Sequence, residues 1–104
     1  MTGPLSGVRV LDLSRILAGP WSTQTLADLG ADVIKVERPG EGDDTRKFGP
    51  PWILDRESGK PIDAAYFAGC NRGKRSITVD FTQTEGQALL HRLAEISAIV
   101  VENY

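Results

Sequence analysis

The sequence has one cysteine, Cys70, and one histidine, His91, among its 104 residues. A single cysteine cannot form a disulfide within the chain, which excludes a disulfide framework and favours a reducing compartment, the cytoplasm. One cysteine and one histidine cannot supply the four ligands of a structural zinc site, so no metal is predicted. We expect Cys70 to be structural and His91 to be exposed and without a catalytic role.

The sequence also lacks a long apolar run and an excess of positive charge. Arg9, Asp12 and Arg15 interrupt the first apolar stretch, residues 8–17, so it is neither a signal segment nor a membrane span. The net charge of −2 gives no general positive field for DNA or RNA. We therefore predict a small folded domain with neither a nucleic-acid nor a membrane partner.

The first third of the chain has the pattern of a β-α-β unit. Residues 8–13 are mostly apolar and include β-branched side chains, which is typical of a buried parallel strand. A helix is predicted over residues 21–29, because Pro20 suits the first turn of a helix and Gly30 suits the left-handed residue that ends one. Residues 31–37 then form the second predicted strand.

The last third repeats this pattern. Residues 76–81 alternate between polar and apolar side chains, as a strand does. Thr82 and Glu85 have the spacing of a capping box, which predicts a helix over residues 83–95. Residues 98–101 are a predicted buried strand. The predicted fold is therefore α/β, a Rossmann-like parallel sheet built from two β-α-β units.

The middle of the chain is harder to assign. Residues 39–61 are rich in glycine, proline and charge, and are predicted to form a long loop, which in a compact domain is functional or disordered. Residues 63–69 are expected to form a short helical or irregular turn.

The acidic segment 41–46 does not have the spacing of an EF-hand and is predicted to be a solvated turn. Trp21 and Trp52 are expected to pack against other residues rather than to stack on a ligand.

The loop between the first strand and the first helix, residues 16–20, is a candidate anion site. Free N–H groups at a helix N-terminus attract anions, although a plain strand–helix turn explains the segment equally well. The Gly-x-Gly-x-x-Gly pattern is absent, because only Gly19 stands between Gly7 and Gly30. NAD binding is therefore disfavoured, even though Glu37 stands near the place of a ribose-binding acid.

The segment 71–75 places three cations around one glycine, just before a predicted strand. Such a cluster is more often a solvated charge run, but guanidinium and ammonium groups also suit phosphate oxygens. Arg38, directly after the second predicted strand, is a further candidate phosphate partner. The sequence contains no evident acid–base pair, triad or metal cluster. These patterns indicate an α/β module for a nucleotide or a CoA-type ligand.

Several segments together resemble the opening of the class III CoA-transferases, the family that includes formyl-CoA transferase, carnitine CoA-transferase and α-methylacyl-CoA racemase. The resembling segments, in order and at similar spacing, are residues 4–13, 17–20, 27–40, 42–46, 71–77 and 101–104. Each segment alone is weak evidence, and the set is specific. The resemblance implies that residues 1–104 are the N-terminal portion of the large CoA-binding domain, and that the chain is a truncated part of a longer protein.

The resemblance implies a transferase that moves CoA between an acyl-CoA and a free carboxylic acid through an aspartyl intermediate. We expect the acid to be a dicarboxylate such as succinate. The catalytic aspartate would lie beyond this chain, so the chain alone is expected to be inactive. CoA or acyl-CoA would be a substrate rather than a tightly bound cofactor, and the full-length protein would be an interlocked homodimer. Two alternatives stay open, an acyl-CoA racemase that uses an acid–base pair and a non-catalytic CoA-binding or dimerisation piece.

The resemblance also implies CoA contacts in the first loop, after the second strand, around the adenine after the third strand, and after the last strand. With the basic segment added, the expected CoA-binding residues are Leu17, Ala18, Arg38, Arg72, Lys74, Arg75, Val79, Asp80, Phe81, Thr82, Asn103 and Tyr104. Leu17 stands where formyl-CoA transferases often have a polar residue such as glutamine. This difference argues against formyl or oxalate specificity.

Overall fold

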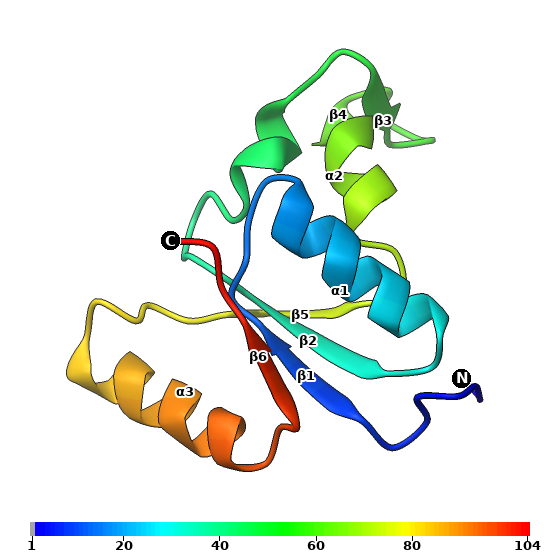
Figure 1. The fold of residues 1–104 in the computed structure, drawn as a ribbon. Helices are drawn as coiled ribbons and strands as arrows, with labels where there is room; N and C mark the ends of the chain where they lie inside the picture. Colours follow the sequence, from blue (N-terminus) through cyan, green and yellow to red (C-terminus); the bar gives the residue numbers. More distant parts are fainter. Residues whose placement is uncertain (1) are drawn as a thin grey trace.

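A computed structural model describes residues 2–104 and contains one four-stranded parallel sheet (Figure 1). Its strands are β1 (Arg9–Asp12), β2 (Asp32–Glu37), β5 (Arg75–Thr78) and β6 (Ile99–Val101). Their spatial order is β5-β2-β1-β6. The chain therefore moves outward from β1 to β5 and then returns to the other side of β1. This is how doubly wound sheets begin, and it creates a switch point beside β1.

Two helices cover opposite faces of this sheet, as Figure 1 shows: α1 (Ala18–Asp28) and α3 (Thr84–Glu95). Successive strand residues point to opposite faces, so each helix packs on its own apolar cluster. The cluster on the α1 face is Val10, Ala27, Ala31 and Val33, and that on the α3 face is Leu11, Val36, Val79 and Leu90. The prediction of an α/β parallel sheet built from two β-α-β units is confirmed.

The ends of the helices differ from their predicted positions. Helix α1 begins at Ala18, three residues early, so that Pro20 still lies in the first turn, where no N–H is needed. The predicted capping box is wrong, because α3 begins after Gln83 without a side-chain cap. The Oγ1 atom of Thr82 instead donates to Asp80 Oδ1 at 2.6 Å, and the Thr82 amide donates to the same oxygen. Because Thr82 is engaged in this turn with Asp80, its side chain does not cap the helix.

The long loop predicted over residues 39–61 contains regular structure, so that prediction is wrong in part. The segment includes η1 (Asp44–Lys47) and β3 (Trp52–Leu54), and it runs into β4 (Pro61–Ala64), which pairs with β3 in a separate antiparallel sheet. Helix α2 (Ala65–Cys70) follows, so of the two predictions for residues 63–69 the helical one is confirmed. Figure 1 shows the hairpin and α2 together, away from α3.

Several apolar side chains lie on the surface of the described chain. Trp21 is 61% exposed, so it is largely uncovered within this chain, whereas Trp52 is 41% exposed and its ring packs against Gly49. His91 is exposed, as predicted, and Cys70 is buried. In the part of the chain that the structure describes, every helix is too short or too polar to cross a membrane.

Candidate functional site

A groove of about 300 Å³ lies at the carboxyl ends of the parallel strands. Ligands of open α/β sheets bind at this edge, outside the switch point. Its lining includes Arg38 after β2, residues 79–82 after β5 and Tyr104 after β6. The sheet order thus brings three segments that are distant in sequence, each predicted to contact CoA, to one groove.

The groove combines aromatic rings with cations. The rings of Phe81 and Tyr104 meet edge to face with their centroids 5.9 Å apart. The guanidinium of Arg15 lies 5.5 Å from the Tyr104 centroid, and its Nη1 atom is 2.7 Å from Asp44 Oδ2. Arg38 binds the other oxygen of Asp44, so one carboxylate holds two guanidinium groups at the groove. Such a set can pair with an anionic group and offers a ring face to a flat base.

The other end of the chain is tied to the first loop. Asn103 Oδ1 accepts a hydrogen bond from the Arg15 amide at 3.1 Å, and Asn103 Nδ2 donates to the Arg15 carbonyl at 2.8 Å. In the structure Leu17 is the last residue of this loop and Ala18 is the first residue of α1. Leu17 lines a separate open hollow with Trp21, so it does not share the groove of Arg38. Arg15 itself does line that groove, and sequence reasoning missed it.

The two arginines of the basic segment lie outside the groove. Arg72 Nη2 is 2.6 Å from Asp28 Oδ2, and Arg75 Nη2 is 2.8 Å from Asp32 Oδ2. Arg75 begins β5 and Asp32 begins β2, so this pair lies at the amino edge of the sheet, opposite the groove. Arg72 lines the same hollow as Leu17. That these arginines bind phosphate stays a prediction, and the structure gives each of them a carboxylate partner.

Lys74 is buried rather than solvated. Its side chain is 2% exposed, and Nζ lies 3.0 Å from Asp12 Oδ2, 3.0 Å from the Pro20 carbonyl and 2.8 Å from Asn71 Oδ1. Thr23 Oγ1 donates to the same Asp12 oxygen at 2.6 Å. Burial lowers the pKa of Lys74 despite the nearby Asp12 carboxylate. This lysine, which directly precedes β5, therefore links that end of the strand to β1 and α1.

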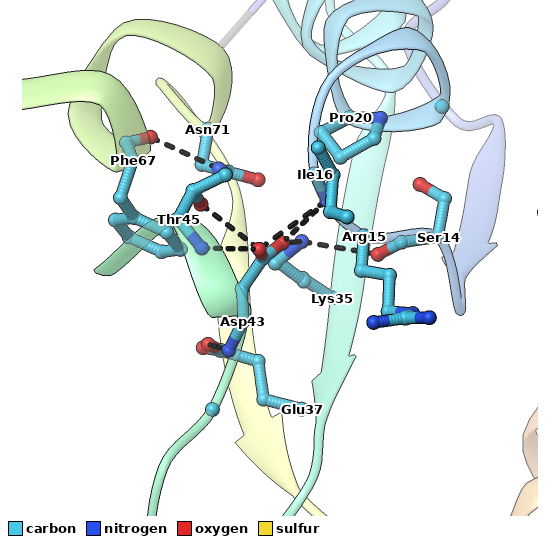
Figure 2. Close-up of polar contacts among 12 residues, drawn as sticks. Ser14, Arg15, Ile16, Pro20, Lys35, Glu37, Asp43, Thr45, Phe67 and Asn71 are labelled. Atoms are coloured by element: carbon cyan, nitrogen blue, oxygen red, sulfur yellow. Dashed lines mark hydrogen bonds and ion pairs between the residues drawn. The ribbon is translucent and has the colours of Figure 1, made fainter. Parts of the chain in front are cut away.

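The acidic segment 41–46 is not a solvated turn, so that prediction is wrong. Asp43 and Thr45 are buried, and Asp43 Oδ2 lies 2.8 Å from Lys35 Nζ with both side chains 1% exposed. Figure 2 shows this pair at the centre of a polar network. Burial alone would raise the pKa of Asp43, but the bonds from Lys35 and Thr45 lower it. Lys35 was the signal in the sequence, since a charge inside an apolar strand needs a partner.

Glu37, at the end of β2, anchors the same segment. Arg46 binds both of its oxygens, and the Asp43 amide donates to Oε1 at 2.9 Å. Burial on its own would raise the pKa of Glu37, but Arg46, Ser76 and the Asp43 amide lower it to about 2. The Arg46 guanidinium also lies 3.7 Å from the ring centroid of Phe67. Glu37, which stands near the place of a ribose-binding acid in the sequence, is thus bound by protein groups.

The groove is a candidate binding site at the carboxyl edge of the parallel sheet. Within residues 2–104, no group of three or more His, Cys, Asp or Glu side chains is placed to share a metal ion. The charged groups around the groove are mostly paired with one another, which fixes the exposed guanidinium groups in position. The arrangement can hold an anionic ligand.

Comparison with known proteins identifies the family. Residues 5–104 match the family model described as CoA-transferase family III. The chain belongs to this family. It is 54% identical over 101 residues to a succinate–glutarate CoA-transferase of Agrobacterium fabrum, covering 97% of this chain and 25% of that protein. It is 50% identical over 101 residues to a succinyl-CoA:glutarate CoA-transferase of Mus musculus, covering 97% and 22%.

A solved structure supports the same assignment. A CAIB/BAIF family protein from Brucella suis is 58% identical, with a TM-score of 0.90 over 100% of this chain and 26% of that one. The chain thus spans about a quarter of the length of these relatives. The family resemblance drawn from the motifs is confirmed. The individual CoA contacts stay predictions.

Proposed function

We propose that this chain is the N-terminal, CoA-binding part of a longer parent protein that transfers CoA between an acyl-CoA and a free carboxylic acid. The observation that carries the proposal is the groove shared by Arg38, residues 79–82 and Tyr104, in a chain that belongs to CoA-transferase family III. The catalytic aspartate lies outside these residues, so this part supplies binding and the parent protein supplies the chemistry.

In this proposal the nucleotide end of CoA occupies the groove. The adenine packs against Val79 and Phe81 near Tyr104, and Arg38 pairs with a phosphate. Arg15 binds the other oxygen of Asp44 and adds a second positive charge beside the same phosphate. The groove is close to the lower limit for small-molecule sites, which fits part of CoA rather than the whole molecule.

The thiol end of CoA would then run toward the start of α1. Leu17 and Ala18 lie where the helix offers free backbone N–H groups, which stabilise a partial negative charge. Asn103 holds the preceding residue of the loop from the other side. These residues contact the carrier and leave the acyl group to parts of the parent protein beyond this chain.

The relatives favour a dicarboxylic acid as the acyl group and as the acceptor. The first two relatives are named for succinate or succinyl-CoA and for glutarate. Their names favour transfer over the racemase reaction. We further propose that CoA is a substrate rather than a bound cofactor, and that the parent protein is an interlocked homodimer in the cytoplasm.

Calorimetry and a transfer assay test this function. The parent protein should bind CoA, bind 3′-dephospho-CoA more weakly, and move CoA from succinyl-CoA to glutarate. Residues 1–104 alone should give no turnover. A parent protein that binds neither form of CoA contradicts the proposal, and turnover by residues 1–104 alone contradicts the placement of the catalytic residue.

A further inference from the structure

Ile16, in the loop between β1 and α1, has an unusual backbone conformation. Its φ is 75°, and among residues 2–104 it is the only residue other than glycine with a positive φ. A β-branched side chain is strongly disfavoured in this left-handed region. Such a conformation persists only where surrounding contacts determine it, and these residues cluster at functional sites.

The buried pair of Lys35 and Asp43 supplies those contacts. Both carboxylate oxygens of Asp43 lie 3.3 Å from the Ile16 amide nitrogen, which donates to them. Lys35 Nζ donates to the Ser14 carbonyl at 3.1 Å as well as to Asp43. Figure 2 shows this arrangement, in which the pair holds the backbone on both sides of Arg15.

Thr45 keeps the carboxylate of Asp43 in place. Its amide and its hydroxyl both donate to Asp43 Oδ1, at 3.0 and 2.9 Å. With Lys35 on the other oxygen, the carboxylate has a fixed orientation toward the loop. Because both oxygens of Asp43 are already hydrogen-bonded by other groups, the carboxylate can hold the Ile16 amide in place before a ligand binds.

We propose that the Lys35–Asp43 pair is a positioning device, which holds Ile16 in its left-handed conformation and thereby sets how the loop meets CoA. Ile16 stands between Arg15, which lines the groove, and Leu17, which precedes α1. The proposal rests on the proposed function, because the loop matters for CoA only if CoA binds there. If the pair served stability alone, breaking it would change the affinity for CoA by the same factor whether residue 16 is isoleucine or glycine.

A double-mutant cycle in the parent protein tests this dependence. The variants are Asp43→Asn, Ile16→Gly and the two combined, and calorimetry measures the affinity for CoA. Asp43→Asn should weaken CoA binding about tenfold when residue 16 is isoleucine, since the loop leaves its strained conformation. With Ile16→Gly present the loss should be less than about threefold, because glycine accepts a positive φ without being held there. Equal losses in both backgrounds would overturn the proposal.

Amide hydrogen exchange separates a failure of this proposal from a failure of the proposed function. Without CoA, Asp43→Asn should speed the exchange of the Ile16 amide, whereas Asp55→Asn in the β3–β4 turn should not. Unchanged exchange at Ile16 overturns the positioning role even if CoA binds. Faster exchange in a protein that does not bind CoA supports the positioning role and refutes the proposed function. If Asp43→Asn does not fold, Thr45→Val takes its place in both experiments, with the same expected and contrary results.

Discussion

Arg46 holds Glu37 through two parallel hydrogen bonds, Nε to Oε1 and Nη2 to Oε2, each 2.7 Å long. This pairing makes stability depend on pH, because the pKa of Glu37 is about 2 in the folded protein against an ordinary 4.5. A depressed pKa gives stability that is complete above pH 4.5 and is lost as the pH falls toward 2. At roughly 1.4 kcal/mol per pKa unit, the contribution is on the order of 3 kcal/mol.

Replacing Glu37 should therefore flatten the acid side of the stability profile. We expect Glu37→Gln to lower the free energy of unfolding at pH 7 and to weaken its dependence on pH below 4.5. Urea unfolding of the parent protein at several pH values measures both effects. Glu41→Gln, at an exposed carboxylate, is the control and should change little. An identical slope for Glu37→Gln and the wild type would contradict the prediction.

Lys74 gives a second prediction, about stability. Lys74→Met should cost about 3–5 kcal/mol, because it leaves the Asp12 carboxylate buried without its cation. Arg72→Met is the matched control, since it breaks a pair whose arginine is 63% exposed, and should cost less than about 1 kcal/mol. Thermal unfolding compares the two variants. Similar costs would mean that the Lys74 pair does not differ from a surface ion pair.

The third prediction concerns which cation recognises CoA. Arg38→Gln should weaken CoA binding about tenfold, as expected for loss of a charged hydrogen bond to phosphate. Arg75→Gln should leave the affinity nearly unchanged, because Arg75 lies at the opposite edge of the sheet on Asp32. Calorimetry with CoA and 3′-dephospho-CoA measures both variants. A larger loss for Arg75→Gln would favour the phosphate role assigned to the basic segment from the sequence.

A fourth prediction concerns the support of the groove by α3. A Cβ at Gly86 would overlap the backbone carbonyl of Asp80, which lines the groove. Gly86→Ala should therefore destabilise by about 1–3 kcal/mol and disturb CoA binding. Gly69→Ala, in α2, meets nothing within 4 Å and should be neutral or slightly stabilising. Thermal unfolding and calorimetry together check the pair, and an equally tolerated Gly86→Ala would contradict the geometry.

Local patterns in the sequence account for the sheet and its helices. Residues 8–13 and 31–37 are rich in valine, leucine and isoleucine, and these side chains pack on both faces of the sheet. The same patterns could not predict β3 and β4, because each is short and lies beside prolines that indicate a loop. They form a hairpin through a six-residue connection, residues 55–60, and pair Trp52 with Ala64, a match that the pattern of either segment alone does not indicate.

The site was predicted only in part, for a related reason. The family motifs and the strand ends indicated Arg38 and residues 79–82, which do share a groove. The basic segment resembled a ligand site because the sequence does not show which acidic residues lie near its cations. In the structure each of these cations pairs with a carboxylate. Asp43 was taken for a solvated residue, since its partner Lys35 becomes close only when the loop folds back over β2.

The link between Asn103 and Arg15 also sets an order of events during synthesis. The two residues are 88 positions apart, and the Asn103 side chain accepts a hydrogen bond from the Arg15 N–H and donates one to the Arg15 carbonyl. At about 5–20 residues per second, the ribosome makes Asn103 roughly 4–18 seconds after Arg15. During that interval the loop between β1 and α1 lacks its hydrogen bonds to Asn103. These two bonds can form only after Asn103 has left the ribosome.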